Sequence, residues 1–378
     1  MPELASAKVA LVHDWLTGMR GGERCLEVFA ELFPRADLYT LLHVPGSVSG
    51  VIENRRVVTS FIQRLPRAEQ RYRHYLPLFP AAVRAFDLSG YDLVLSSSHA
   101  VAKSVRIPAG VRHVCYCFTP MRYVWDLYDD YFGARAGMAA RLLMPPVAAW
   151  LRRWDRATAS GVHHFVAISR FVADRIRRTY GRHADVIYPP VDVSRFRLDD
   201  SPGDFYLVVS ALTPYKRVDL AVEACNRLGR RLLVVGSGPE AARLRALAGP
   251  TVELLGWRGD AETAELYARC RALLFPPLED FGITPLEAMA AGRPVIAFGR
   301  GGARETVVPP GGGEAPTGLF FDHQTVDDLV DAIRRLESGA IAFEPKTLRR
   351  RAEGFDRPLF RERVQAYLEA RLGEPVRC

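Results

Sequence analysis

Short apolar runs alternate with amphipathic stretches along the first half of this chain of 378 residues. The apolar runs are rich in valine, leucine and isoleucine, and they occupy residues 9–12, 92–95, 114–117 and 165–168. Runs of this length and composition predict buried strands, and the stretches between them have the apolar spacing that predicts helices. An alternation of strands and helices is typical of parallel βα units.

The second half repeats this pattern after a proline-rich segment at residues 188–192. Its apolar runs occupy residues 205–209, 232–235, 252–255, 273–275 and 295–298. The prolines make the segment a natural linker, and the chain is too long for one typical core. We therefore predict an α/β protein with two Rossmann-like domains, residues 1–188 and 189–357, whose parallel sheets face a cleft.

A last helix is predicted from about Pro358 to Leu372, within a final segment of residues 358–378. Basic residues separate its apolar positions, which are Leu359, Phe360, Val364, Tyr367 and Leu368. This amphipathic pattern fits any surface helix.

The formal net charge of +8 points to an anionic partner. That partner could be a nucleic acid, a phosphorylated substrate or an acidic membrane surface, and we favour the last two because no nucleic-acid motif is present. No charge-free apolar run approaches the roughly 18 residues that span a bilayer. The first eight residues lack the basic start and apolar stretch of a signal peptide, so we expect a cytoplasmic protein.

The six cysteines show no pattern of metal or disulfide chemistry. There is no CxxC pair and no histidine pair at zinc spacing, so neither a disulfide framework nor a structural metal is indicated. We expect most of them to be buried as small apolar residues. They stand at positions 25, 115, 117, 225, 270 and 378.

Two glutamates, Glu279 and Glu287, lie in the segment that follows the apolar run at 273–275. A loop that leaves the carboxyl end of a strand and opens a helix is where phosphorylated ligands bind in α/β proteins. A structural role for Glu287 is an open alternative, because Thr284 and Glu287 have the spacing of a helix-capping box. Capping does not account for Glu279, and Gly282 would let the backbone approach a ligand closely.

The full motif P-x-E-D-F-G-I-T-P-L-E-A-M-A-A-G-x-P-V-I-A, at residues 277–297, resembles the donor-site signature of retaining glycosyltransferase family 4. The likeness extends to most of the chain. The segments His-Asp-Trp-Leu at 13–16, Ser-Ser-Ser-His-Ala at 96–100 and Phe-Thr-Pro-Met-Arg-Tyr at 118–123 are most similar to bacterial mannosyltransferases of polysaccharide assembly, including lipopolysaccharide.

The resemblance implies the two-domain GT-B fold, with an acceptor-side N-terminal domain, a donor-binding C-terminal domain and a last helix that crosses back onto the N-terminal domain. It implies that Glu279 contacts hydroxyl groups of the transferred sugar, and that Glu287 contacts the ribose. The backbone of Phe281, Gly282 and Ile283 belongs to the same donor site.

Basic residues are expected to hold the donor phosphates. Lys216 and Arg217 are adjacent at a helix start, which is unfavourable for the helix dipole and therefore favours a bound anion over a solvated pair of charges. The family pattern has an arginine six residues before the lysine, where this chain has Ser210. We expect Arg217 to supply the missing charge.

Three further turns are implicated by the same resemblance. Gly21 and Gly22 follow the first strand, so their N–H groups could hold the donor phosphates across the cleft, although a simple tight turn is an alternative. The turns at Gly236 and at Trp257 and Arg258 are expected around the nucleotide, although ordinary turn chemistry explains them equally well.

His99 stands at the carboxyl end of a predicted strand. A histidine beside a run of serines is more often structural, but relatives keep a histidine here near the donor sugar. The resemblance therefore assigns it a hydrogen bond to a sugar hydroxyl and support of the developing cation.

The chain has no Asp-x-Asp triplet of the kind that metal-dependent transferases use, so we expect no metal and no cofactor. The resemblance favours GDP-mannose as the donor. It also implies that the acceptor attacks from the same face, so that the configuration is retained, and that the leaving phosphate accepts the acceptor's proton. Alternatives are a UDP-sugar donor, a nucleotide-sugar epimerase, or a two-domain sugar-binding protein, which would need an export signal.

Two segments mix basic and apolar residues as a membrane-surface segment would, at residues 61–79 and 141–154. Both could instead be core-facing helices with solvated charges. If they contact lipid, the acceptor is expected to be a polyprenyl-diphosphate-linked sugar, and the protein would be peripheral on the inner face of the cytoplasmic membrane.

Overall fold

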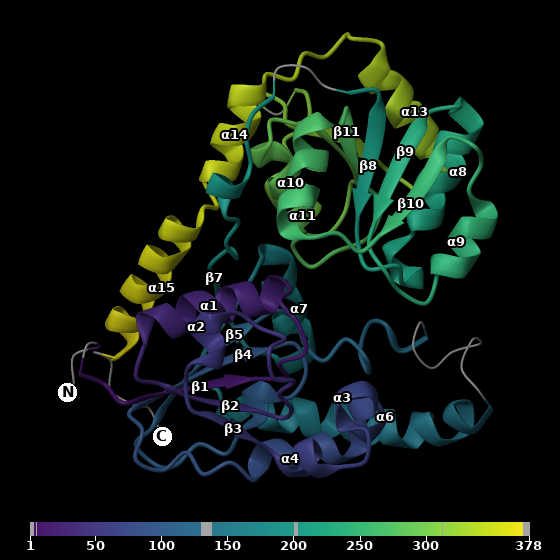
Figure 1. Ribbon diagram of the computed structural model, residues 1–378. Helices are drawn as coiled ribbons and strands as arrows, with labels where there is room; N and C mark the ends of the chain where they lie inside the picture. Colours follow the sequence, from purple (N-terminus) through teal and green to yellow (C-terminus); the bar gives the residue numbers. More distant parts are fainter. Residues whose placement is uncertain (1–3, 5, 130–137, 200–202, 312, 373–378) are drawn as a thin grey trace. The chain divides into compact units, whose positions relative to one another are not determined.

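The computed structural model describes residues 4, 6–129, 138–199, 203–311 and 313–372 (Figure 1). Cys378, three of the first four residues and the end of the predicted 358–378 segment lie outside the described residues. The chain divides into two compact units, Met1–Pro189 with Phe360–Cys378, and Pro190–Leu359. Each unit is built on one parallel sheet, which confirms the predicted α/β fold class.

The first unit has a seven-stranded sheet in the order β3-β2-β1-β4-β5-β6-β7, and its strands pair in parallel. Every residue of β1, β4 and β5 is buried, as expected for central strands covered on both faces. The strands are β1 Val9–His13, β2 Asp37–Thr40, β3 Val57–Thr59, β4 Leu93–Ser98, β5 Arg112–Cys117, β6 His164–Ala167 and β7 Ala184–Val186.

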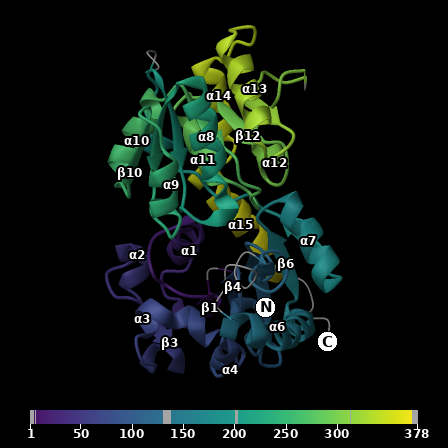
Figure 2. The same ribbon diagram turned by 90° about the vertical axis from the view of Figure 1, so that its right-hand side faces the viewer.

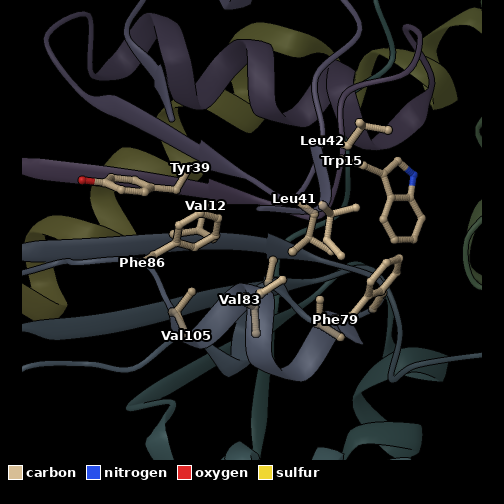
Figure 3. Close-up of a cluster of buried hydrophobic side chains, with 14 of the residues drawn as sticks. Val12, Trp15, Tyr39, Leu41, Leu42, Phe79, Val83, Phe86 and Val105 are labelled. Atoms are coloured by element: carbon tan, nitrogen blue, oxygen red, sulfur yellow. The ribbon is translucent and has the colours of Figure 1, made fainter. Parts of the chain in front are cut away.

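Helices cover both faces of this sheet. The core on one face joins the sheet to α4 and α6, and Figure 3 shows Phe79 and Val83 of α4 beneath Val12 of β1. On the opposite face lie α1 and α15, while α7 lies against β6 (Figure 2). The helices are α1 Gly21–Leu32, α2 Gly50–Glu53, α3 Ala68–Arg71, α4 Phe79–Arg84, α6 Met138–Thr158, α7 Arg170–Tyr180 and α15 Arg357–Leu372.

The last helix, α15, belongs to the first unit from Phe360 onwards. Phe360 is buried, and its ring centroid lies 5.8 Å from that of Phe29 on α1 and 5.7 Å from that of Tyr116 on β5. Tyr367 donates a hydrogen bond of 2.8 Å to Asp185 in β7. The predicted final helix therefore completes the core of a domain whose other residues precede position 190.

The second unit has a six-stranded parallel sheet in the order β10-β9-β8-β11-β12-β13. Helices α8 and α13 share a core on one face, while α10, α11 and α14 lie on the other (Figure 1). The strands are β8 Phe205–Val209, β9 Arg231–Val235, β10 Val252–Gly256, β11 Ala272–Phe275, β12 Val295–Phe298 and β13 Gly318–Phe321. The helices are α8 Val218–Leu228, α9 Ala241–Leu247, α10 Asp260–Arg269, α11 Ile283–Ala290, α12 Ala303–Thr306, α13 Val326–Glu337 and α14 Pro345–Glu353.

Strand order reverses once in each sheet. The first sheet grows outwards from β1 through β2 to β3 and then resumes on the other side of β1 with β4; the second does the same at β8 and β11. The loops after the two strands at such a switch point diverge and leave a crevice, where ligands of open α/β sheets bind.

The described cysteines are buried, as the sequence predicts. Cys25, Cys115, Cys117, Cys225 and Cys270 are all buried as free thiols. Among the described residues, no helix has both the length and the apolar character needed to cross a membrane.

We predict that Phe360→Ala lowers the free energy of unfolding of the first unit by about 3–5 kcal/mol, because it leaves a cavity between α1, α15 and β5. Denaturation followed by tryptophan fluorescence measures this well, since Trp15, Trp125, Trp150 and Trp154 belong to that unit. Arg363→Ala, at an exposed position on α15, is the control and should change stability by less than about 0.5 kcal/mol. Equal stability of both variants would mean that α15 contributes nothing to this core.

Candidate functional site

Asp14 and His99 lie on the two sides of the first switch point. Asp14 follows β1 directly and His99 follows β4 directly, so both stand at the carboxyl ends of neighbouring strands. His99 Nδ1 lies 3.1 Å from Asp14 Oδ2, with 28% of the His99 side chain exposed and none of Asp14. The predicted histidine is therefore placed where a ligand of this sheet would bind, beside a fully buried carboxylate.

A second histidine, His13, lies in the same place. Its Nδ1 is 2.7 Å from Ser97 Oγ, and its buried Nε2 is 3.8 Å from Glu23 Oε1, longer than a hydrogen bond. Within the described part of the chain, His13 Nε2 has no hydrogen-bond partner. Neither His13 nor Glu23 was among the predicted site residues, although His13 is the last residue of a strand that ends at the switch point.

Gly21 and Gly22 do not form a separate turn ahead of the first helix. They are the first two residues of α1, and Glu23 in the same turn accepts a hydrogen bond of 3.1 Å from the Arg20 N–H. A Cβ on Gly22 would lie 3.4 Å from the Phe118 ring and 3.6 Å from His13. The helix start is therefore brought next to His13, whose ring centroid is 6.3 Å from that of His99.

Burial lowers the pKa of His99, and the nearby Asp14 carboxylate opposes that shift only in part. The net direction is downward, so the imidazole is neutral at neutral pH. A neutral ring has one nitrogen that donates and one that accepts a hydrogen bond.

Lys216 and Glu279 form an ion pair at the second switch point. Lys216 ends the short 3₁₀ turn Pro214–Lys216 after β8, and Glu279 lies on the loop after the neighbouring strand β11. Both side chains are largely buried, and the Glu279 carbonyl accepts a hydrogen bond of 2.9 Å from the Gly302 N–H. The two residues predicted for phosphate and sugar are thus brought into direct contact.

Arg217 does not join this pair. It adopts a left-handed conformation with φ of 50°, and its guanidinium lies 3.3 Å from Asp219 in the first turn of α8. The positive charge of Arg217 is therefore paired within the first turn of α8. The expectation that Arg217 replaces the arginine missing at Ser210 gains no support from this geometry.

The predicted capping box at Thr284 is wrong. Helix α11 begins at Ile283, two residues earlier than a Thr284 cap implies, and its N-cap is Gly282, which has no side chain to accept a hydrogen bond. Glu287 instead accepts a hydrogen bond of 2.8 Å from the hydroxyl of Tyr267 on α10. Burial raises the pKa of Tyr267, and the Glu287 carboxylate raises it further, so the phenol stays a donor.

The residues between the two glutamates are placed by packing. Phe281 is buried against Phe355, with 5.8 Å between ring centroids, so only its backbone can face a ligand. Gly282 has φ of 88°, and a Cβ there would lie 2.8 Å from the Phe275 ring. Glycine is therefore required by the fold itself, rather than by the approach of a ligand. Ile283 is the first residue of α11.

The remaining predicted residues follow β9 and β10. Gly236 has φ of 139°, and a Cβ there would lie 1.8 Å from the Ser210 carbonyl oxygen, so the loops after β8 and β9 touch. Trp257 follows β10 and is 74% exposed, and Arg258 forms an ion pair of 2.7 Å with Glu262. They share the carboxyl edge of the sheet with Lys216, but β10 is two strands away from β8.

Two parallel Rossmann-like sheets, each with polar side chains at its switch point, are typical of the GT-B class. Sequence models of two domain families match in succession: Glycosyltransferase Family 4 at residues 19–195 and Glycosyl transferases group 1 at residues 194–353. Together they account for nearly all of both units. The chain belongs to the family 4 glycosyltransferases, as its motifs predict.

Individual relatives agree with this assignment. A GDP-mannose-dependent alpha-(1-6)-phosphatidylinositol monomannoside mannosyltransferase of Mycobacterium tuberculosis is 32% identical over 51% of this chain and 56% of its own length. The chain spans about half the length of the curated relatives it matches.

Solved structures match over the whole chain and show the fold alone. The sucrose-phosphate synthase of Thermosynechococcus elongatus has a TM-score of 0.72 at 18% identity, covering 97% of this chain and 100% of its own. Anabaena HepE with UDP-glucose has a TM-score of 0.69 at 17% identity, covering 96% and 99%.

We predict that Gly236→Ala destabilises the second unit by about 1–3 kcal/mol, because its methyl group would overlap the Ser210 carbonyl and force the two loops apart. Gly256→Ala is the matched control, since Gly256 also has a positive φ, 76°, but a Cβ there meets no atom within 4 Å. Denaturation followed by circular dichroism measures both. If the two variants lose the same stability, the contact between the loops is not a constraint.

Proposed function

We propose that this protein is a retaining, metal-independent glycosyltransferase that moves mannose from GDP-mannose to a glycan acceptor. The observation that carries the proposal is the pairing of Lys216 with Glu279 at the switch point of the second sheet. A cation suited to a phosphate and a carboxylate suited to sugar hydroxyls stand together where a ligand of such a sheet binds.

The leaving group of this reaction is a nucleoside diphosphate, whose developing charge must be stabilised. The Lys216 ammonium and the N–H groups in the first turn of α11 are fixed positive groups next to the Glu279 loop. They support departure of the diphosphate without a metal. Lys216 is paired with Glu279, so a phosphate would compete for the ammonium and release the carboxylate toward the sugar.

Each carboxylate has a separate role in this proposal. Glu279 accepts hydrogen bonds from the transferred sugar, and Glu287 accepts one from the ribose while Tyr267 holds it in place. His99 supports the sugar as the sugar-to-phosphate bond breaks. The acceptor hydroxyl then attacks from the same face, and its proton passes to the departing phosphate, so retention needs no protein nucleophile.

The mannose assignment is supported by relatives named as GDP-mannose-dependent mannosyltransferases. A UDP-sugar donor is the second candidate, supported by the structural likeness to a protein solved with UDP-glucose. An epimerase would form product from the nucleotide sugar without an acceptor, and a sugar-binding protein would bind without turnover.

A lipid-linked acceptor is supported by the surface of the first unit. Both predicted membrane segments contribute core residues, such as Tyr72 and Leu151, so the core-facing alternative holds for their inner sides. On its outer side α6 exposes large apolar residues, among them Leu142 at 71% and Leu143 at 66%, with Arg141 exposed beside them. The other segment exposes the basic residues Arg64, Arg67, Arg71, Arg73 and His74.

Exposed apolar side chains on one segment and exposed basic side chains on another, both in the first unit, fit an anionic bilayer, because basic groups attract lipid headgroups and leucines enter the apolar layer. We therefore propose that the protein is peripheral on the inner face of the cytoplasmic membrane and takes a polyprenyl-diphosphate-linked acceptor.

We predict that GDP is released slowly from GDP-mannose in the presence of EDTA, and that Glu279→Gln slows this release about 10- to 100-fold, the size of one charge-assisted hydrogen bond. UDP-glucose and UDP-N-acetylglucosamine, presented in parallel, should bind more weakly. Glu253→Gln, at an exposed position on β10, is the matched control and should behave like the wild type. No binding of any of the three donors would contradict the assignment of the donor site.

We predict that the protein sediments with phosphatidylglycerol-containing vesicles at low salt and is released by high salt. It should not sediment with vesicles of phosphatidylcholine alone. Leu142→Glu with Leu143→Glu should weaken sedimentation about tenfold or more, because burying one leucine contributes about 1.5–3 kcal/mol. Val51→Glu, at an exposed apolar position on α2, is the control. Undiminished sedimentation of the α6 variant would exclude α6 as the membrane contact.

A further inference from the structure

Asp14 is surrounded by donors from the chain segment that carries His99. Its carboxylate is fully buried and accepts hydrogen bonds from four consecutive backbone N–H groups. Oδ2 accepts from His99 at 2.6 Å and Ala100 at 2.9 Å, and Oδ1 accepts from Val101 and Ala102 at 2.7 Å each. A buried carboxylate whose two oxygens each accept two backbone hydrogen bonds is held immobile, because both oxygens are satisfied.

The same carboxylate also faces the side chain of His99. Asp14 Oδ2 lies 3.1 Å from His99 Nδ1. A lone pair on Nδ1 would be repelled by the negative charge at that distance, whereas an Nδ1–H would be attracted to it. The ring is restrained from another side by Trp15, whose centroid is 4.4 Å away in an edge-on arrangement.

We propose that Asp14 is a positioning residue that holds His99 as the Nδ1–H tautomer, so that His99 Nε2 can only accept a hydrogen bond. The partner of Nε2 must then be a donor, such as a sugar hydroxyl, and not a carbonyl or phosphate oxygen. This inference rests on the proposed function for the identity of that hydroxyl, but not for the tautomer.

The neutral state of the ring fits this role. Burial lowers the pKa of His99, so that Nε2 keeps its lone pair at neutral pH. An imidazolium would donate from both nitrogens and would place a positive charge beside an oxocarbenium-like transition state. The accepting tautomer instead directs electron density toward the sugar.

The tautomer is measured directly by long-range ¹H–¹⁵N NMR on protein labelled at histidine, with His99→Gln to assign the signals. In the wild type without ligand, we expect His99 to be protonated at Nδ1 and bare at Nε2. In Asp14→Asn, we expect a shift toward the Nε2–H form, because the amide carries no negative charge. Wild-type protonation at Nε2, or an unchanged tautomer in Asp14→Asn, overturns the proposal.

Kinetic measurements distinguish two roles of Asp14: positioning the His99 ring, or only supporting the loop at residues 99–102. We expect Asp14→Asn to lower kcat about 10- to 100-fold with little change in KM, as for loss of one charge-assisted hydrogen bond. In a His99→Gln background, the same substitution should cause little further loss, because Asp14 acts through His99. Losses that multiply in the double variant would mean that Asp14 serves the loop alone, and would overturn the proposal.

Ser60→Ala is the control for loss of a buried backbone cap in the same unit. Ser60 Oγ accepts a hydrogen bond of 3.1 Å from the Ile62 N–H and does not contact His99. Its removal should cost stability but leave the His99 tautomer and kcat unchanged. If Asp14→Asn does not fold, the His99 tautomer measured in the ligand-free wild type still tests the proposal. Absence of turnover with every donor would refute only the proposed function.

Discussion

Parallel pairing is the constraint on which both candidate sites depend. Because every strand of a sheet points the same way, all carboxyl ends meet at one edge. Only where the strand order reverses do adjacent loops diverge to opposite faces. The side chains with chemistry are found there in both units, after β1 and β4 in one and after β8 and β11 in the other.

The two sites manage buried negative charge in opposite ways. Asp14 is satisfied by backbone groups that cannot leave, so its carboxylate is a permanent part of the fold. Glu279 is balanced by the side chain of Lys216, which can exchange one anion for another. The immobile Asp14 carboxylate is suited to orienting a neighbouring ring. The Glu279 carboxylate, whose partner Lys216 can pair with another anion, is suited to a site that binds a charged ligand.

The sequence was sufficient for the central strands, whereas the roles of the site residues stay predictions. Apolar runs mark strands buried on both faces, but β2, β3 and β7 are too short, or too polar, to stand out. Strand β13 is apolar and as long as β11 and β12, and it is missing from the predicted runs. The capping box failed because Tyr267, from another helix, holds Glu287. Asp14 could not be recognised from local pattern, since its donors are backbone groups 85 or more residues away.

The packing of α15 has a consequence for biosynthesis. Phe360 fills a core position between Phe29 and Tyr116, yet the ribosome makes the entire second unit before it reaches that residue. The second unit can fold as soon as it emerges, whereas the first must wait with an open apolar face on α1 and β5. The domain translated first is therefore the last to complete its core. Until Phe360 is made, this domain is the part of the nascent chain most exposed to aggregation and most dependent on chaperones.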